Sequence, residues 1–170
     1  MTRLDAVVQK FGMYKYQAVG NVFIVACPEG AKPMRGTKED YPGAAEDRYP
    51  KQHYLKMVQL GLKIVEVAQE FQSAAGKPLW AQVGITCGEA AGAVIGKKRR
   101  FYCIYGDTLN TSARVCSAAA PGEVFVTTRF ADKVRGVEGA AEAFALACKG
   151  KFELKGKGFV ELHQVSERPR

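Results

Sequence analysis

Two polar side chains at helical spacing, Asn110 and Arg114, are the residues of this sequence best suited to chemistry. They end the stretch 102–114, YCIYGDTLNTSAR, which passes from an apolar run through Gly106 to a polar helical pattern. Side chains four residues apart on a helix lie about 6 Å from each other on one face. An amide and a guanidinium in this arrangement predict a site for a small anionic, hydroxylated ligand such as a nucleotide.

The elements around this stretch alternate between helix and strand patterns. Helices are expected at 4–11, 52–75, 108–119 and near 130–134, and strands at 14–18, 22–26, 79–87, 91–95, 101–105, 124–127, 151–155 and 159–165. Gly20-Asn21 is typical of a tight hairpin turn, and strands 79–87 and 91–95 are expected to pair. The sequence therefore predicts an α+β fold, with an antiparallel sheet and helices on one face.

The long amphipathic helix and the segment before it organise the middle of the chain. Apolar residues recur at helical spacing from Tyr54 to Phe71, which predicts that Phe71 lies on the buried face. Segment 28–51 carries prolines, glycines and charges, so a surface loop is expected there. All 170 residues suit one domain that contains this loop.

Charge indicates which partners suit the chain. There are 25 Lys and Arg against 17 Asp and Glu, a formal charge of +8, which attracts phosphates. Nucleic acid is the rival partner, and Lys97–Arg100 is its best patch, but no recognisable nucleic-acid module surrounds it. We expect a solvated basic hairpin tip there and no nucleic-acid binding.

Cysteine usage and hydropathy indicate the compartment. The five cysteines are scattered, with no CxxC pair and no Cys/His cluster of zinc spacing, which favours a reduced, intracellular compartment. No run reaches the roughly 18 apolar residues that a membrane helix needs. We expect a cytoplasmic segment without membrane contact, either free or part of a membrane-tethered parent.

Five ordered segments resemble one known family. Stretch 102–114 is similar to the GDTVNxAxR signature of the class III purine nucleotide cyclases, the adenylate and guanylate cyclases. The other segments are KYQAVGNVFIV at 15–25, AQVGITCGEAAGAVIG at 81–96, PGEVFVT at 121–127 and ELKGKG at 153–158. The resemblance implies a ferredoxin-like core and head-to-tail pairing of two domains around the active site. The family's first strand and most of its first helix have no counterpart in this sequence.

The resemblance also implies a reaction and its residues. These enzymes convert GTP or ATP into the 3′,5′-cyclic monophosphate and pyrophosphate, with Mg²⁺ or Mn²⁺, in intracellular signalling. Asn110 matches the asparagine that orients the ribose, and Arg114 the arginine that stabilises charge on the α-phosphate. Lys155 matches the lysine that contacts the β- and γ-phosphates, and we prefer it to Lys157.

Two positions in this family select the base. They correspond to Gln17 and Cys103. Guanylate cyclases typically carry Glu and Cys there, and adenylate cyclases Lys and Asp. Cys103 therefore favours guanine, whereas Gln17 fits neither pattern and its amide can both donate and accept hydrogen bonds. GTP and ATP both remain open as substrates, with a preference for GTP.

The metal site departs from the family pattern. Its two aspartates lie on the first strand and directly after the hairpin glycine, where this chain has Asn21. No metal ligand is therefore assigned, and we expect the metal to be held mainly by a partner cyclase domain, with a heterodimer favoured. The alternative is a catalytically inactive cyclase-homology domain that binds nucleotide, dimerises or regulates.

Overall fold

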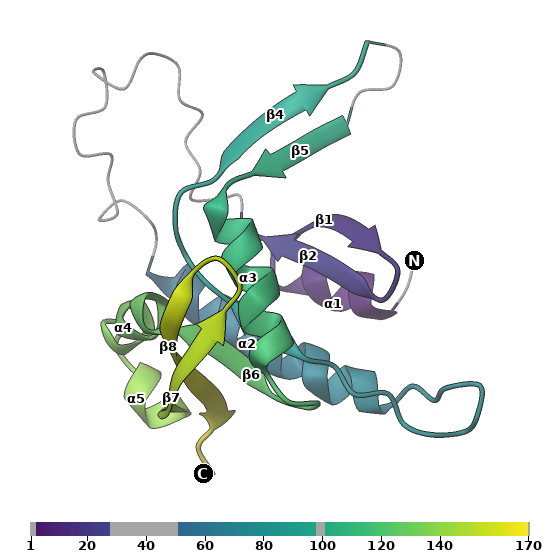
Figure 1. The fold of residues 1–170 in the computed structure, drawn as a ribbon. Coiled ribbons are helices and arrows are strands. Elements are labelled where there is room, and N and C mark those ends of the chain that lie inside the picture. Colours follow the sequence, from purple (N-terminus) through teal and green to yellow (C-terminus); the bar gives the residue numbers. More distant parts are fainter. Residues whose placement is uncertain (1–2, 28–50, 98–100, 170) are drawn as a thin grey trace, which may run out of the picture.

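The computed structural model describes residues 3–27, 51–97 and 101–169, and the expected loop 28–51 and the basic tip lie largely outside this part. Figure 1 shows its elements. The helices are α1 (Arg3–Lys10), α2 (Gln52–Gln69), α3 (Asp107–Ala118), α4 (Thr128–Arg135) and α5 (Ala140–Ala143). The strands are β1 (Tyr14–Val19), β2 (Val22–Ala26), β3 (Val83–Ile85), β4 (Ala91–Ile95), β5 (Phe101–Tyr105), β6 (Val124–Thr127), β7 (Phe144–Leu154) and β8 (Gly158–Glu167).

A four-stranded sheet in the order β3-β6-β8-β7 forms the centre of the fold. Strand β8 pairs antiparallel with β6 and β7, whereas β3 and β6 run parallel. The α+β fold class is confirmed. The pairing expected between 79–87 and 91–95 is wrong, because Val83–Ile85 pairs with β6 while β4 pairs with β5.

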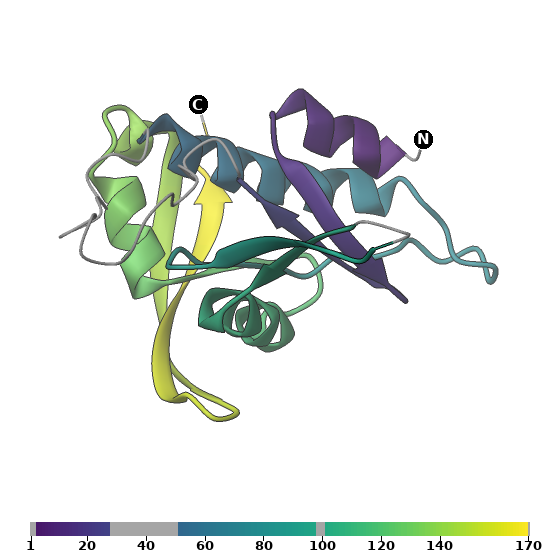
Figure 2. The same cartoon turned by 90° about the horizontal axis from the view of Figure 1, so that it is seen from above.

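Helices cover both faces of this sheet, which corrects the expectation of one covered face. Val124 and Val126 pack in a cluster with residues of α2 and α4. Phe125 lies between them in the strand and packs with Val115 of α3 and Leu162 of β8. Because successive strand residues point to opposite faces, α3 lies across the sheet from α2 and α4, as Figure 2 shows.

Helix α2 confirms the amphipathic pattern but ends earlier than predicted. Val58 is buried against the sheet and α4, whereas Leu60 and Ile64 are buried in a second cluster with Val8 of α1. The helix ends at Gln69, and Phe71 lies beyond it with 37% of its surface exposed. Its carbonyl oxygen accepts a hydrogen bond from the backbone N–H of Leu79. This contact turns the chain back, so Phe71 does not belong to the helix's buried face.

Two separate two-stranded ribbons complete the described part. Val19 pairs with Val22, so Gly20 and Asn21 form the turn of the β1–β2 hairpin as predicted. The β4–β5 ribbon projects away from the four-stranded sheet (Figure 1). All five residues of β4 are exposed. Among the described helices, none is long and apolar enough to cross a bilayer.

Strands β7 and β8 are longer than the sequence indicated. The expected strand 151–155 begins at Phe144, directly after the short helix α5, which periodicity missed. The two strands pair from Phe144 with Glu167 to Leu154 with Gly158. This long hairpin carries the ELKGKG segment at its turn and lies beside α3 (Figure 1).

Candidate nucleotide site

Helix α3 is placed on the sheet by a close approach at Gly84. A Cβ atom added to Gly84 would lie 2.5 Å from the carbonyl oxygen of Ser112 and 2.6 Å from Cα of Cys116. Since real Cβ contacts are not that short, only glycine lets β3 and α3 approach this closely. Val115, fully buried, anchors the same helix in the core.

The start of α3 is fixed by the loop that follows β3. Gly106 has a φ of 143°, a value that favours glycine, and directly precedes the helix. The hydroxyl of Thr108 donates a hydrogen bond to the carbonyl oxygen of Glu89 at 2.6 Å. Asp107 lies in the first turn, where a negative charge is favourable. The motif predicted from sequence is thus a strand, a glycine turn and a helix.

Asn110 and Arg114 both lie on α3, as expected, and the helical spacing of Asp107, Asn110 and Arg114 places them on one face. Asn110 is exposed and Arg114 is half-buried. A Cβ atom added to Gly156 would lie 3.7 Å from Nη1 and 3.9 Å from Nη2 of Arg114. The guanidinium therefore lies against the backbone of the β7–β8 turn.

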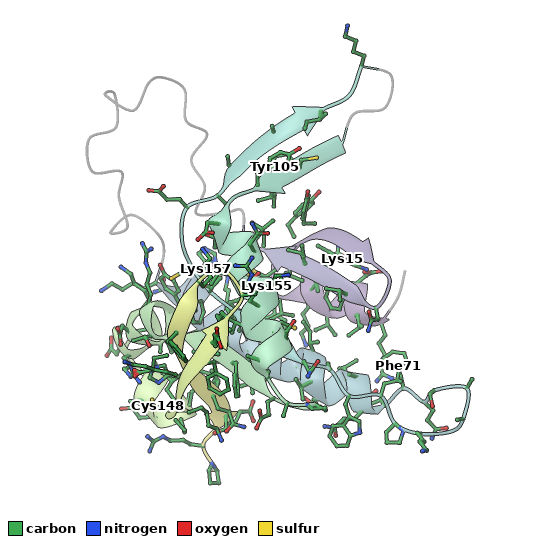
Figure 3. The ribbon with its side chains drawn as sticks, in the orientation of Figure 1. Lys15, Phe71, Tyr105, Cys148, Lys155 and Lys157 are labelled. Atoms are coloured by element: carbon green, nitrogen blue, oxygen red, sulfur yellow. The ribbon has the colours of Figure 1, made fainter. Side chains whose placement is uncertain are left out.

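The two lysines of the ELKGKG segment have different surroundings. The ammonium of Lys157 forms an ion pair with the carboxylate of Asp107 at the start of α3. Lys155 is exposed. Figure 3 shows both lysines at the turn beside α3. The structure thus brings Arg114, Lys155 and Lys157 together from segments about 40 residues apart in sequence, and the Lys157 pairing is a contact that the motif did not reveal.

The two predicted base-selecting positions lie on neighbouring ribbons. Gln17 lies on β1 and pairs with Ile24 of β2, and the Gln17 side chain lies outside what the structure describes. Cys103 lies on β5, where it is buried and pairs with Ala93 of β4. The rings of Tyr14 and Tyr102 meet edge to face, with centroids 6.0 Å apart, and so connect β1 with β5.

Tyr105 is a further residue of this region that sequence reasoning passed over, although it lies within the motif stretch. A hydrogen bond with the Cys103 thiol, together with burial and the nearby Tyr16, raises the pKa of the Tyr105 phenol. Tyr105 thus lies near Cys103 on the same strand and near Tyr16 on β1. Figure 3 shows Tyr105 on β5, above α3.

The residues present do not fit the two-magnesium site of the cyclases. Asn21, which the resemblance aligns with the second metal aspartate, is exposed at the hairpin turn and offers a neutral amide. The carboxylate at the start of α3, Asp107, is paired with Lys157. Within residues 3–27, 51–97 and 101–169, the only group of three potential metal-ligating side chains is Cys148, Glu161 and His163, on β7 and β8.

Comparison with known proteins agrees with this architecture. Residues 1–167 match the family described as "Adenylate and Guanylate cyclase catalytic domain". Guanylate cyclase 2D of Rattus norvegicus is 26% identical over 97% of this chain, which spans 13% of that protein. Soluble guanylate cyclase gcy-33 of Caenorhabditis elegans is 28% identical over 98% of this chain, which spans 16% of that protein.

Solved structures share the fold. The guanylate cyclase domain of RhGC from Catenaria anguillulae, in complex with GTP, superposes with a TM-score of 0.75 at 23% identity, covering 98% of this chain and 79% of that one. The adenylyl cyclase CyaB from P. aeruginosa gives a TM-score of 0.69 at 20% identity, covering 98% and 78%. With the family match over residues 1–167, these findings show that the chain belongs to the adenylate and guanylate cyclase catalytic domain family.

Proposed function

We propose that this chain forms one domain that supplies the nucleotide-holding half of a class III cyclase site. A second cyclase domain supplies the metal aspartates, and together they convert GTP or ATP into the 3′,5′-cyclic monophosphate and pyrophosphate. The observation that carries the proposal is the position of Arg114 against Gly156, which unites the α3 motif with the ELKGKG turn. Two cationic segments distant in sequence thereby lie side by side.

The roles follow from the chemistry of a triphosphate. In-line attack of the ribose 3′ oxygen on the α-phosphorus builds charge on the phosphoryl oxygens, so cations and correct orientation supply most of the acceleration. Arg114 offers a planar donor fork for the α-phosphate, and exposed Lys155 a compact charge for the β- and γ-phosphates. Asn110, one turn before Arg114, orients the ribose. Gln17 and Cys103 contact the purine, with GTP preferred.

The metal ions belong to the partner in this proposal. Mg²⁺ is usually held by one or two carboxylates together with phosphates and water. Because Asn21 offers only an amide, the chain alone should bind Mg²⁺ or Mn²⁺ poorly and turn over slowly. Receptor and soluble guanylate cyclases among the relatives support an output role in cytoplasmic signalling.

A second candidate function is a cyclase-homology domain without catalysis. Asn21 in place of a carboxylate favours it, and so does Lys157, whose charge is already balanced by Asp107. Such a domain would bind nucleotide or dimerise and thereby regulate a partner. The enzyme and the nucleotide-binding form of this second candidate both require a nucleotide to contact Arg114, whereas a domain that only dimerises does not.

The test mixes this chain with an aspartate-bearing cyclase domain. GTP or ATP is added with Mg²⁺ or Mn²⁺, and cyclic nucleotide is measured. We expect product from the mixture and little from this chain alone. Absence of product, together with nucleotide binding that Arg114→Ala leaves unchanged, would overturn the enzyme proposal. Absence of product with binding that depends on Arg114 would favour the inactive domain.

A further inference from the structure

Three metal-ligating side chains converge on the β7–β8 hairpin, away from the nucleotide site. Glu161 and His163 are two residues apart on β8, so they point to the same face of the sheet. Cys148 lies directly opposite His163 on β7. Their possible ligand atoms all lie within 4.8 Å of one another. Figure 3 places Cys148 apart from Lys155 and Lys157.

The backbone supports this convergence. The pairing of β7 with β8 shifts register between Cys148 and Gly150, which marks a β-bulge directly after Cys148. A bulge bends its strand and redirects the neighbouring side chains. Cys148 is exposed and Glu161 is half-buried, so both can adjust their rotamers, while buried His163 is fixed.

Hydrogen bonds define the state of the His163 ring. Arg135 Nη2 lies 3.4 Å from Nδ1, and a guanidinium can only donate, so Nδ1 is the acceptor. The proton of the neutral ring is then on Nε2, which donates to the hydroxyl of Thr128 at 3.2 Å. That hydroxyl donates in turn to the backbone oxygen of Glu161 at 3.2 Å. Such a chain orients a metal-binding imidazole and makes Nδ1, once Arg135 is displaced, the nitrogen that offers a lone pair to the metal.

We propose that Cys148, Glu161 and His163 bind one thiophilic divalent cation, Zn²⁺ in the first place. Sulfur, nitrogen and oxygen donors together favour Zn²⁺ over Mg²⁺. Tetrahedral binding at Zn²⁺ distances requires the donor atoms to move to about 3.5 Å from one another. Cys148 loses its thiol proton to solvent on binding, His163 binds through Nδ1, and water takes the fourth position.

Arg135 competes with the cation for His163. Its guanidinium shares the Nδ1 side of the ring and also pairs with Asp132 at 2.7 Å. Metal binding must displace Arg135 from Nδ1, while the pair with Asp132, three residues away on α4, can remain. Removal of this positive charge should therefore strengthen metal binding.

The test is a titration of the full chain with Co²⁺, a coloured substitute for Zn²⁺. We expect one equivalent to give tetrahedral cobalt absorption and a thiolate-to-cobalt charge-transfer band, both abolished by Zn²⁺. Cys148→Ser should lose the charge-transfer band. Cys116→Ser, which removes a thiol on α3, serves as the matched control and should keep it. Zn²⁺ should also raise the melting temperature of the wild type but not of Cys148→Ser.

Two further variants sharpen the result. Arg135→Gln should bind Co²⁺ severalfold more tightly than the wild type. Thr128→Val, which removes the partner of Nε2, should bind it roughly 10-fold to 100-fold more weakly. The proposal is overturned if the wild type binds no stoichiometric Co²⁺ or Zn²⁺, if Cys148→Ser keeps the charge-transfer band, or if Arg135→Gln weakens binding.

Discussion

The phosphate side and the base side of the candidate site are built in different ways. On the phosphate side, α3 is anchored through buried Val115 and the close approach at Gly84, and the β7–β8 turn meets it at Arg114. On the base side, β1 and β5 belong to two separate ribbons joined by the ring contact of Tyr14 with Tyr102. Helix α3 packs on the four-stranded sheet, and the β1–β2 ribbon packs through Phe23 and Val25 in a cluster with residues of α1 and α2, whereas the β4–β5 ribbon projects away from the sheet.

This difference indicates which half of the site has a stable structure in this chain alone. A two-stranded ribbon is marginally stable alone in water. The β4–β5 ribbon also exposes Val94 (65%) and Tyr102 (43%). The phosphate side, by contrast, is held by side chains that are buried or paired. We therefore expect substitutions on the phosphate side to change reaction rate or folding, and those on the base side to change selectivity.

The largest effect is expected at Arg114. Arg114→Ala should lower the rate of the mixed cyclase by about 100-fold to 1,000-fold, because a donor aimed at developing phosphate charge is lost. Initial rates of cyclic nucleotide formation measure this. Lys56→Ala, at an exposed cation of α2, is the control and should keep the full rate. Equal rates for the two variants would show that Arg114 does not contribute to the reaction.

The next effect concerns the anchoring of α3. Gly84→Ala should lower the free energy of unfolding by about 3 kcal/mol, since the new methyl group collides with the backbone of α3. Denaturant titration provides the value. Gly136→Ala is the control, because its φ is −78° and the nearest atom to an added Cβ is 3.6 Å away. If Gly84→Ala proves as stable as Gly136→Ala, the helix is not held by this contact.

The base side is tested by selectivity. Gln17→Glu should raise the preference of the mixed cyclase for GTP over ATP by roughly tenfold, since a charged acceptor strengthens hydrogen bonds to guanine. The ratio of kcat/KM values for the two nucleotides measures it, and the free energy of unfolding should hardly change. An unchanged ratio would contradict the placement of Gln17 and Cys103 at the purine.

The smallest effect is expected for the ion pair between the two segments. Asp107→Ala should lower the free energy of unfolding by less than about 1 kcal/mol, since the carboxylate is exposed. Lys157→Ala should do the same. The double variant Asp107→Ala with Lys157→Ala should lose less than the sum of the two single losses if the pair joins α3 to the turn. Single and double losses that simply add would show that the two residues do not interact.

Local sequence signals predicted much of this fold. Gly20-Asn21 gave the hairpin turn, and the strand, glycine and polar helix pattern gave the face shared by Asn110 and Arg114. These features depend on neighbours in the chain. The sequence predicts too long a helix α2. The apolar residues continue at helical spacing to Phe71, but the chain turns there, and the backbone of Phe71 bonds with Leu79 instead of continuing the helix.

The features that the sequence did not predict depend on contacts between residues far apart in the chain. The parallel pairing of β3 with β6 depends on the path of the chain between the two strands. The periodicity of apolar residues does not determine that path. The pairing of Lys157 with Asp107 depends on the position of the β7–β8 turn over α3. Likewise, Cys148 and His163 are 15 positions apart in sequence and meet only through strand register. Local spacing contains none of these contacts.

A complementation assay tests whether the site is divided between this chain and a metal-bearing partner domain. The partner is an aspartate-bearing cyclase domain whose own ribose-orienting asparagine and transition-state arginine have been replaced, so that these groups can come only from Asn110 and Arg114. We expect little cyclic nucleotide from either protein alone and much more from the mixture, lost again with Arg114→Ala. As much product from this chain alone as from the mixture, or full product from the mixture with Arg114→Ala, would contradict the proposal.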